Sequence, residues 1–409
     1  MIMPPRETDL PTTGGSLPQL LPPGYIVLTR QLDNIMLLPA TTRKGLNVTP
    51  FILPTLLPAL AGLGFSAIVQ AQELRPLHEA TSGKIEFTSV ALDSSTAQAV
   101  RKTLKFTESI SGDLQFPDKP GAVPAMVVLH GSGGPNQTTA TEWSRWIRSL
   151  GVATFTVDSF TSRSIANTVS DQSQISYPAS ALDALVALKV IAKNPRIDRN
   201  RIGVIGFSRG GAAAQMSAVD TFRKGVMDDD LKFAVHLAFY GSCSRVGKTT
   251  GAPIVHFFGA DDDQFNEAGC KEATDFIKNL GGEVDLVIYK GARHGFDSNQ
   301  GSSSLVREMM TVGNCHQMFD MDNNKFFVEG RSVTSAEYDA YSKTCARKGM
   351  WYQMQFTAKN ASRDRVKYGS SVCSCPSSHA KLPGGLTHRD FELARLKAAR
   401  RQRPSDRPT

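Results

Sequence analysis

The middle of the chain alternates short, nearly continuous apolar runs with longer segments whose apolar residues recur at helical spacing. Short apolar runs are typical of strands buried on both faces, and the longer segments are typical of amphipathic helices. The predicted strands are 124–130, 152–157, 202–205, 233–240, 253–258 and 284–289. The predicted helices are 142–150, 179–192, a segment from the alanines at 212–214 to about 223, and 270–280. Alternation of this kind predicts an α/β fold, with a mostly parallel sheet and helices on both faces.

The pattern changes on both sides of this region. Residues 84–92 alternate in part and predict a strand, and Ser111-Gly112-Asp113 predicts the turn of a hairpin within 104–116. Beyond the last predicted strand the periodicity loosens, apart from a predicted helix at 333–347. Serine, proline, glycine and basic residues then dominate, so we expect a disordered basic tail at 366–409.

The N-terminal region has the pattern of an export signal. Arg43-Lys44 precedes an apolar run at 51–69, and small residues end at Ala71. A basic segment, an apolar segment and a small-residue site in this order predict a signal peptide that is cleaved after Ala71. Pro54, Pro58 and Gly62 interrupt the apolar run, which favours a cleaved signal over a permanent membrane helix. An uncleaved anchor is the alternative.

The position of this signal suggests where translation starts. A signal peptide should begin near the first residue, and Met36 is a natural start, so residues 1–35 are interpreted as an upstream extension. The predicted organisation is therefore an extension plus signal peptide at 1–71, an α/β domain at 72–365 and the tail. A protein with this organisation is expected in the periplasm or outside the cell.

Composition restricts the classes of protein to which the chain can belong. It has 409 residues, of which 41% are hydrophobic, and a formal net charge of +8. Much of the positive charge lies within 395–407, and there is no zinc-finger spacing and no interleaving of aromatic and basic residues. A basic end is usually solvated, so we expect no nucleic-acid partner. The six cysteines, an even number that suggests disulfides in an exported protein, are Cys243, Cys270, Cys315, Cys345, Cys373 and Cys375.

A candidate nucleophile lies between a predicted strand and a run of small residues. Gly206-Phe207-Ser208-Arg209-Gly210 fits G-x-S-x-G, which builds a sharp strand-turn-helix elbow with an exposed serine hydroxyl. The following helix would direct free N–H groups toward an anion. The alternative is an ordinary turn of a nucleotide-binding type of fold.

Two later segments supply partners for Ser208. Asp261-Asp262-Asp263 follows the strand 253–258, and His294 follows the strand 284–289. Because a serine hydroxyl is a weak nucleophile, it needs an imidazole to accept its proton and a carboxylate to orient that imidazole. We expect His294 as the base and Asp262 as the acid, with Asp263 as the second choice. The alternatives are an aspartate that only caps a helix and a surface histidine.

Gly131-Ser132-Gly133-Gly134 follows an earlier strand, and such a loop can point backbone N–H groups inward. The amides of Ser132 and Arg209 are therefore predicted to form an oxyanion hole, and His130 is predicted to shape the loop. The alternative is that the loop only turns the chain.

Other polar clusters predict no metal or cofactor site. The segment Asp320–Asn324 has some spacing of a calcium loop but lacks its glycine and its final glutamate, so we expect a surface loop. Cys373 and Cys375 have no partners at metal spacing. Asp158 and Arg163 either border the pocket or form an ion pair that holds their loop.

Four segments of the chain resemble the dienelactone hydrolase family of α/β-hydrolases, and most of all its exported bacterial members. They are residues 124–135 (PAMVVLHGSGGP), 157–163 (VDSFTSR), 198–211 (DRNRIGVIGFSRGG) and 291–296 (GARHGF). The resemblance covers about 84–297. It implies the α/β-hydrolase fold and hydrolysis of an ester or lactone, with Ser208 as nucleophile, Asp262 as acid and His294 as base. The enzymes that gave the family its name use cysteine as nucleophile, so a general carboxylic-ester hydrolase is expected here.

The sequence therefore predicts a serine hydrolase that acts on a small-molecule ester through an acyl-enzyme, without metal or cofactor. A non-catalytic binding protein of the same fold and a peptidase are the alternatives. Cys243 follows one strand and Cys270 begins the helix after the next, so these two residues are expected to form a disulfide. Cys315–Cys345 is the second predicted disulfide.

Overall fold

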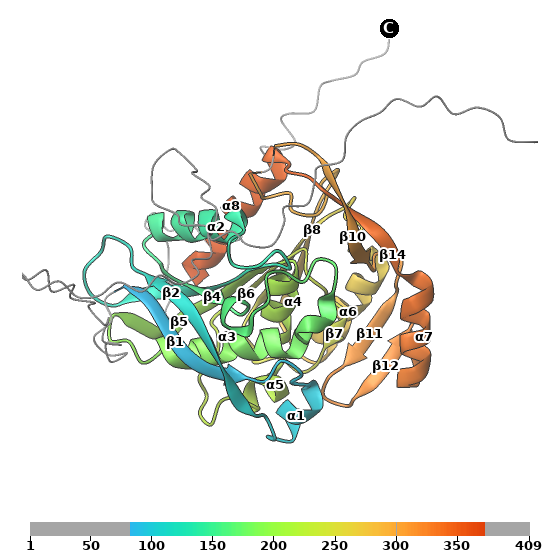
Figure 1. Ribbon diagram of the computed structural model, residues 1–409, viewed down its shortest axis with the longest axis horizontal. Coiled ribbons are helices and arrows are strands. Elements are labelled where there is room, and N and C mark those ends of the chain that lie inside the picture. The colour runs from blue at the N-terminus through green and yellow to red at the C-terminus, as the bar shows by residue number, and fades with distance from the viewer. Residues whose placement is uncertain (1–81, 300, 373–409) are drawn as a thin grey trace, which may run out of the picture. The chain divides into compact units, whose positions relative to one another are not determined.

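An eight-stranded sheet forms the centre of the molecule (Figure 1). The computed structural model describes residues 82–299 and 301–372, and the predicted signal peptide, its cleavage site and residues 373–409 lie outside this range. The order of the strands is β1-β2-β4-β3-β5-β6-β8-β9. Their bounds are β1 Gly83–Val90, β2 Phe106–Gln115, β3 Val123–Leu129, β4 Ala153–Asp158, β5 Ile197–Phe207, β6 His236–Phe239, β8 Ile254–Gly259 and β9 Val284–Tyr289.

The sheet is parallel from β4 to β9, as the alternation of strands and helices predicts. At the other edge, β1 pairs with β2 and β2 with β4 in antiparallel fashion. The inner parallel strands are apolar along nearly their whole length because both faces are covered. The C-terminal ends of β5, β8 and β9 therefore lie at one edge of the sheet, next to the segments that carry Ser208, Asp262 and His294.

Helices cover both faces of the sheet. One hydrophobic cluster joins one face to α1, α3, α4 and α5, and a second joins the other face to α2, α6 and α8. In Figure 1, α2 and α8 lie above the sheet and α3 lies below it. The bounds are α1 Thr96–Val100, α2 Thr138–Ser149, α3 Tyr177–Ile191, α4 Arg209–Met216, α5 Asp220–Lys224, α6 Glu267–Asn279, α7 Ser335–Cys345 and α8 Phe356–Val372.

A group of short strands outside the main sheet was not predicted. In an antiparallel ribbon, β10 (Ser304–Thr311) pairs with β14 (Arg347–Tyr352). The four-stranded sheet contains β7 (Arg245–Val246), β11 (Gln317–Asp320), β12 (Lys325–Val328) and β13 (Arg331–Val333). These strands are only partly buried, so they lack the continuous apolar runs that identify buried strands.

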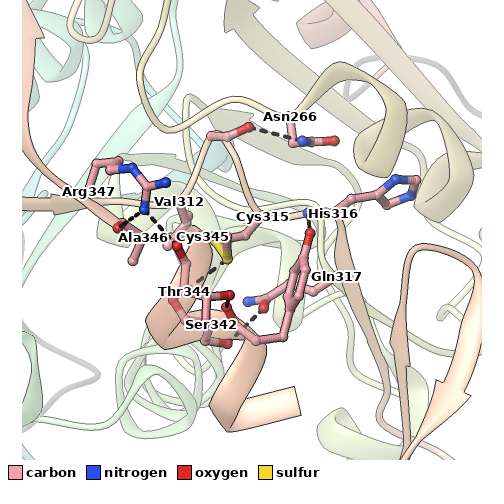
Figure 2. Close-up of a disulfide and its surroundings, with 12 residues drawn as sticks. Asn266, Val312, Cys315, His316, Gln317, Ser342, Thr344, Cys345, Ala346 and Arg347 are labelled. Carbon is pink, nitrogen blue, oxygen red and sulfur yellow. Dashed lines mark hydrogen bonds between the residues drawn. A yellow bond between two sulfur atoms is a disulfide. The ribbon is translucent and has the colours of Figure 1, made fainter. Parts of the chain in front are cut away.

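Both predicted disulfides are present. One joins Cys243, which follows β6, to Cys270 in α6. The other joins Cys315, between β10 and β11, to Cys345 at the end of α7, and Figure 2 shows its surroundings. The second disulfide therefore connects the ribbon, the small sheet and α7 to one another.

The predicted hairpin within 104–116 is wrong, because β2 runs straight through Ser111-Gly112-Asp113. The glycine is needed for packing, since a Cβ at Gly112 would lie 2.3 Å from Cζ of Phe155 on the neighbouring strand. The hairpin turn lies earlier, between β1 and β2, where α1 forms.

Other predicted boundaries also differ from the structure. The helix after the elbow ends at Met216, and α5 is a separate helix. Helix α8 includes residues 366–372, which we expected to belong to the tail, and Val366 is buried. The segment Asp320–Asn324, predicted as a surface loop, begins at the last residue of β11, where Asp320 is buried, and forms the turn to β12 with Asn323 and Asn324 exposed. Within the described residues, every helix is too short or too polar to cross a bilayer.

Candidate active site

Ser208 lies at a strained turn between β5 and α4. Its backbone has φ 54° and ψ −116°, a conformation that L-residues rarely adopt and that tertiary structure must hold. The flanking glycines permit the turn, because a Cβ at Gly206 would lie 2.0 Å from the carbonyl oxygen of Gly210. The Ser208 N–H donates to the Phe239 carbonyl on β6, 2.9 Å away. The predicted elbow is therefore present.

The structure brings Ser208, His294 and Asp262 together from three separate segments. Nε2 of His294 lies 3.0 Å from Oγ of Ser208. Nδ1 of the same ring lies 2.9 Å and 3.1 Å from the two carboxylate oxygens of Asp262. His294 and Asp262 are both buried, whereas Ser208 is partly accessible. This arrangement allows the imidazole to accept a proton from the hydroxyl while the carboxylate orients the ring.

Asp263, the second choice for the acid, points elsewhere. Its Oδ2 accepts a hydrogen bond of 2.8 Å from the backbone N–H of Trp351 on β14. Its carbonyl oxygen accepts another, of 2.9 Å, from the Gly313 N–H. Asp263 therefore links the end of β8 to the β10–β14 ribbon, and Asp262 is the aspartate next to His294.

The two residues predicted to supply the oxyanion hole both lie beside Ser208. Arg209 is the first residue of α4, so its N–H has no acceptor within that helix. Ser132 follows β3, and a Cβ on Gly131 would lie 3.3 Å from Cβ of Ser208. Both residues are buried. Among the described residues, neither backbone N–H donates to a protein acceptor.

His130 has the supporting contacts predicted for it. Its Nδ1 donates to the Gly131 carbonyl over 2.8 Å, and its Nε2 accepts from the Ser159 N–H over 3.4 Å. Burial lowers the pKa of His130, which agrees with a neutral ring that donates at one nitrogen and accepts at the other. The residue thus connects the glycine loop to the end of β4.

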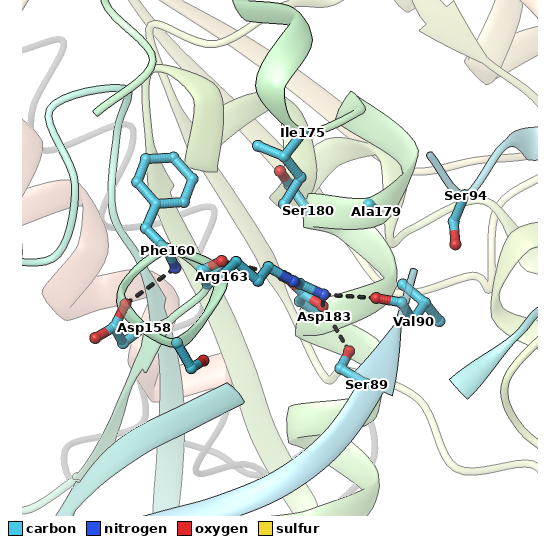
Figure 3. A network of polar contacts seen from close by, with 12 residues as sticks. Ser89, Val90, Ser94, Asp158, Phe160, Arg163, Ile175, Ala179, Ser180 and Asp183 are labelled. Atoms are coloured by element: carbon cyan, nitrogen blue, oxygen red, sulfur yellow. Dashed lines mark hydrogen bonds and ion pairs between the residues drawn. The ribbon is translucent and has the colours of Figure 1, made fainter. Parts of the chain in front are cut away.

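Asp158 and Arg163 do not pair with each other. Asp158 accepts from the N–H groups of Phe160 and Thr161, whereas Arg163 pairs with Asp183 of α3 at 2.6 Å. Figure 3 shows this network, in which Ser89 also donates to Asp183. Both side chains of the ion pair are completely buried. The predicted ion pair between Asp158 and Arg163 is therefore wrong, and Arg163 holds the loop through Asp183 instead.

A second buried carboxylate lies near His294, and the sequence pattern did not indicate it. Asp297 accepts hydrogen bonds of 2.6 Å from both Trp143 Nε1 and Tyr240 OH. The Tyr240 ring lies 4.7 Å from the His294 ring, between their centroids. Burial raises the pKa of Asp297. Its position three residues after the histidine was visible in the sequence, but its two partners come from α2 and from the end of β6.

No group of metal-binding side chains occurs within residues 82–299 and 301–372. The described part of the site contains a hydroxyl, an imidazole, carboxylates and backbone amides, which are sufficient for acyl transfer. These groups can form a covalent intermediate with a carbonyl compound and stabilise the negative charge on its oxygen.

A family model described as the dienelactone hydrolase family matches residues 110–319, just over half of the chain. No match was found among curated proteins.

Two solved structures similar to this chain are an esterase and a phosphotriesterase. The esterase Est2 of the planctomycete Thermogutta terrifontis is 16% identical, with a TM-score of 0.37, and the match covers 47% of this chain and 80% of that one. A promiscuous phosphotriesterase from metagenomic libraries, described as dienelactone hydrolase-like, is 15% identical, with a TM-score of 0.40 and coverage of 71% and 98%.

Proposed function

The chain belongs to the dienelactone hydrolase family, and from that premise we propose that it is a serine-dependent hydrolase of carboxylic esters or lactones that acts through an acyl-enzyme. The continuous line of hydrogen bonds from Ser208 through His294 to Asp262 is the observation that carries the proposal. It joins a nucleophile to a base and the base to an orienting carboxylate.

In the first half of the reaction, Ser208 Oγ attacks the ester carbonyl carbon while its proton passes to Nε2 of His294. The carbonyl oxygen becomes an oxyanion, which the Ser132 and Arg209 N–H groups stabilise. The bond to the alcohol then breaks, and the alcohol leaves with the proton from His294. Asp262 keeps Nδ1 protonated throughout and stabilises the imidazolium that forms.

In the second half, water attacks the acyl carbon of the Ser208 ester and gives a proton to His294. The same two amides stabilise the second oxyanion. The acid product forms when the bond to Oγ breaks and Oγ takes the proton back from the imidazolium. A lactone follows the same steps, with the alcohol remaining attached to the product.

Turnover of p-nitrophenyl acetate is the direct test. We expect the wild-type protein to release p-nitrophenol, and Ser208→Ala to reduce kcat by about 10⁵-fold or more. The matched control is Ser149→Ala, an exposed serine at the end of α2, which should retain full activity. Equal activity of Ser208→Ala and the wild type would overturn the proposal.

Two other functions, a non-catalytic binding protein and a peptidase, make different predictions in this assay. A binding protein would show no turnover in either form. A peptidase would hydrolyse a peptide amide with the same dependence on Ser208. The ester is favoured because the family model that matches is that of dienelactone hydrolases.

We also propose that the protein is exported. The two disulfides support this location, because such bonds persist in oxidising compartments. The test is mass spectrometry of the N-terminus of the protein purified from its natural source, where Gln72 is the expected first residue. Finding residues 1–35 on the exported protein would contradict both the predicted cleavage and the predicted start.

A further inference from the structure

Gln172 makes hydrogen bonds to the side chains of both residues that we propose as oxyanion donors. It begins the 3-10 helix Gln172–Gln174, in the loop between β4 and α3. Its Oε1 accepts from Nη2 of Arg209 at 2.7 Å, and its Nε2 lies 3.0 Å from Oγ of Ser132. One amide side chain thus joins two residues that belong to different elements and are far apart in the sequence.

A second route connects Gln172 to the backbone of Ser132. Nε2 of Gln172 donates to the Thr168 carbonyl at 2.6 Å. The Thr168 N–H in turn donates to the Ser132 carbonyl at 2.8 Å. Because the carbonyl and the N–H of Ser132 belong to the same short loop, a shift of Thr168 would change the direction of the Ser132 N–H. Gln172 therefore restrains Ser132 through both its side chain and its backbone.

The guanidinium of Arg209 has only neutral partners, and it donates from both Nε and Nη2 to the side-chain oxygen of Gln172. It donates to the carbonyl oxygens of Gln172 and Ile175, at 2.7 Å and 3.0 Å, and it stacks over the Tyr177 ring at 4.2 Å. No carboxylate pairs with it among the described residues, and burial lowers the pKa of Arg209. Loss of the Oε1 acceptor would remove the hydrogen bond that Nε of this buried cation donates at 3.2 Å, so the Arg209 side chain would move.

We propose that Gln172 is a positioning residue that sets the spacing and direction of the Ser132 and Arg209 N–H groups. This inference rests on the proposed function, because those amides matter only if an oxyanion forms between them. Gln172 acts through its two partners and is not assigned a contact with the substrate. Its removal should weaken binding of the tetrahedral intermediate far more than binding of the ester, since donors fixed in advance contribute most where charge develops.

The test variant is Gln172→Met, which keeps the length of the side chain and removes its hydrogen bonds. We expect kcat for p-nitrophenyl acetate to fall about 10- to 100-fold, because small displacements of catalytic groups have effects of that size. KM should stay within about twofold of wild type, since the ground-state contacts remain. Affinity for a trifluoromethyl ketone, which forms a tetrahedral adduct with a serine nucleophile, should fall by the same factor as kcat/KM.

The matched control is Gln174→Met, in the same 3-10 helix. Gln174 is exposed, and its amide donates to the carbonyls of Asn167 and Asp171 rather than to the site. This variant should change kcat by less than about twofold, as expected for a surface substitution. A general loss of order in the loop would affect both variants, whereas the proposed role affects only Gln172→Met.

A double-mutant cycle with Ser132→Ala gives an independent measure. Ser132→Ala removes the Oγ that contacts Gln172 but keeps the backbone N–H. If the two residues act together, the double variant should lose less activity than the product of the single losses. Fully multiplicative losses would show that Gln172 does not act through the Ser132 hydroxyl and would count against the proposal.

The outcomes separate this inference from the proposed function. Turnover that depends on Ser208 but is unchanged in Gln172→Met overturns only the role of Gln172. Turnover that does not depend on Ser208 overturns the proposed function itself. If Gln172→Met fails to fold, Gln172→Glu serves the same test. It keeps an acceptor for Arg209 but places an oxygen against the Thr168 carbonyl, and its kcat should fall at least about 10-fold. Wild-type activity in that variant would contradict the proposal.

Discussion

The two sides of Ser208 are supported in different ways. On the side of His294, backbone groups of residues 351–355 hold the loops: the N–H of Gln353 donates to the His294 carbonyl at 3.0 Å, and the N–H of Gln355 donates to the Phe296 carbonyl at 2.9 Å. On the side of Ser132 and Arg209, the amide side chain of Gln172 makes the connections. Hydrogen bonds from backbone N–H groups remain possible with many different side chains at those positions, whereas hydrogen bonds from a side chain require that residue type.

The anchors behind the two sides differ as well. The loop that carries Gln172 is fixed to α3 by the buried ion pair of Arg163 and Asp183, which also binds the end of β1 (Figure 3). The ribbon behind His294 belongs to the same region as the Cys315–Cys345 disulfide (Figure 2). One side therefore relies on buried charge and the other on backbone pairing and a covalent bond. We therefore expect the Ser132 and Arg209 side to be most sensitive to replacement of a single polar side chain. The His294 side should be most sensitive to added side-chain volume.

The largest loss of activity is expected when the hydrogen bonds that connect Ser208, His294 and Asp262 are disrupted. Asp262→Asn should lower kcat by about 10³- to 10⁴-fold, because an amide stabilises the wrong tautomer of His294. Asp263→Asn is the matched control, since Asp263 contacts the Trp351 backbone instead, and it should lower kcat less than about tenfold. Kinetics of p-nitrophenyl acetate hydrolysis measure both. If Asp263→Asn had the larger effect, the acid would be Asp263.

The buried ion pair should show the next largest effect, in stability. Asp183→Asn leaves the Arg163 charge buried without its counter-charge, which should reduce the free energy of unfolding by about 3–5 kcal/mol. Glu308→Gln removes a carboxylate from the exposed Lys348–Glu308 pair and should have no resolvable effect. Urea denaturation of the two variants measures the difference. Equal stabilities would show that the ion pair does not anchor the loop.

Added bulk should disturb the His294 side. Gly295 has φ 68°, and a Cβ there would lie 2.1 Å from Cζ of Tyr352, so Gly295→Ala must displace the histidine loop or β14. We expect a loss of stability of about 2–3 kcal/mol from strain and overpacking, together with reduced kcat.

Gly281→Ala is the matched control for Gly295→Ala. Gly281 has a similar φ of 82° but no neighbouring atom within 4 Å of the added Cβ. Gly281→Ala should reduce the free energy of unfolding by only about 1–2 kcal/mol, from backbone strain, and should keep full activity. Thermal melts and ester kinetics check both variants, and unchanged kcat in Gly295→Ala would show that β14 does not position His294.

The smallest expected effect is on the pH dependence of stability, and it comes from the buried carboxyl group of Asp297 on the His294 side. Burial raises the pKa of Asp297, so the folded state holds this proton more tightly than the unfolded chain does. The stability from this group is therefore fully present below the unfolded pKa of about 3.9 and is lost as pH rises through the folded pKa. Relative to Asp297→Asn, the wild type should gain stability as pH falls through that window.

For Asp198→Asn, the difference in stability from the wild type should change with pH in the opposite direction to that for Asp297→Asn. A hydrogen bond from Arg201 lowers the pKa of Asp198, so its contribution is present above the unfolded pKa and is lost as pH falls. Urea denaturation of the three proteins at several pH values measures both slopes. A pH-independent difference between wild type and Asp297→Asn would contradict the raised pKa.

Much of the sheet and of the His294 side was predictable from local pattern. The apolar runs of β3, β5, β8 and β9 identify buried strands, and their order places Ser208, Asp262 and His294 on one edge. The contacts of Gln172 were not predictable. Nothing in the residues around it distinguishes it from Gln174, and its partners come from the ends of β3 and β5. The β10–β14 ribbon was missed for a related reason, since its strands are only partly buried.

The sequence by itself determined the alternation of strands and helices, the strained turn at Ser208 and the family to which the chain belongs, because these depend on residues close to one another along the chain. Only the tertiary structure decided that Asp262 rather than Asp263 meets His294, that Arg163 pairs with Asp183 rather than Asp158, and that Gln172 joins Ser132 to Arg209. Side-chain partners of this kind depend on the direction in which each chain segment leaves its strand. That direction is set by packing between elements that are distant in the sequence.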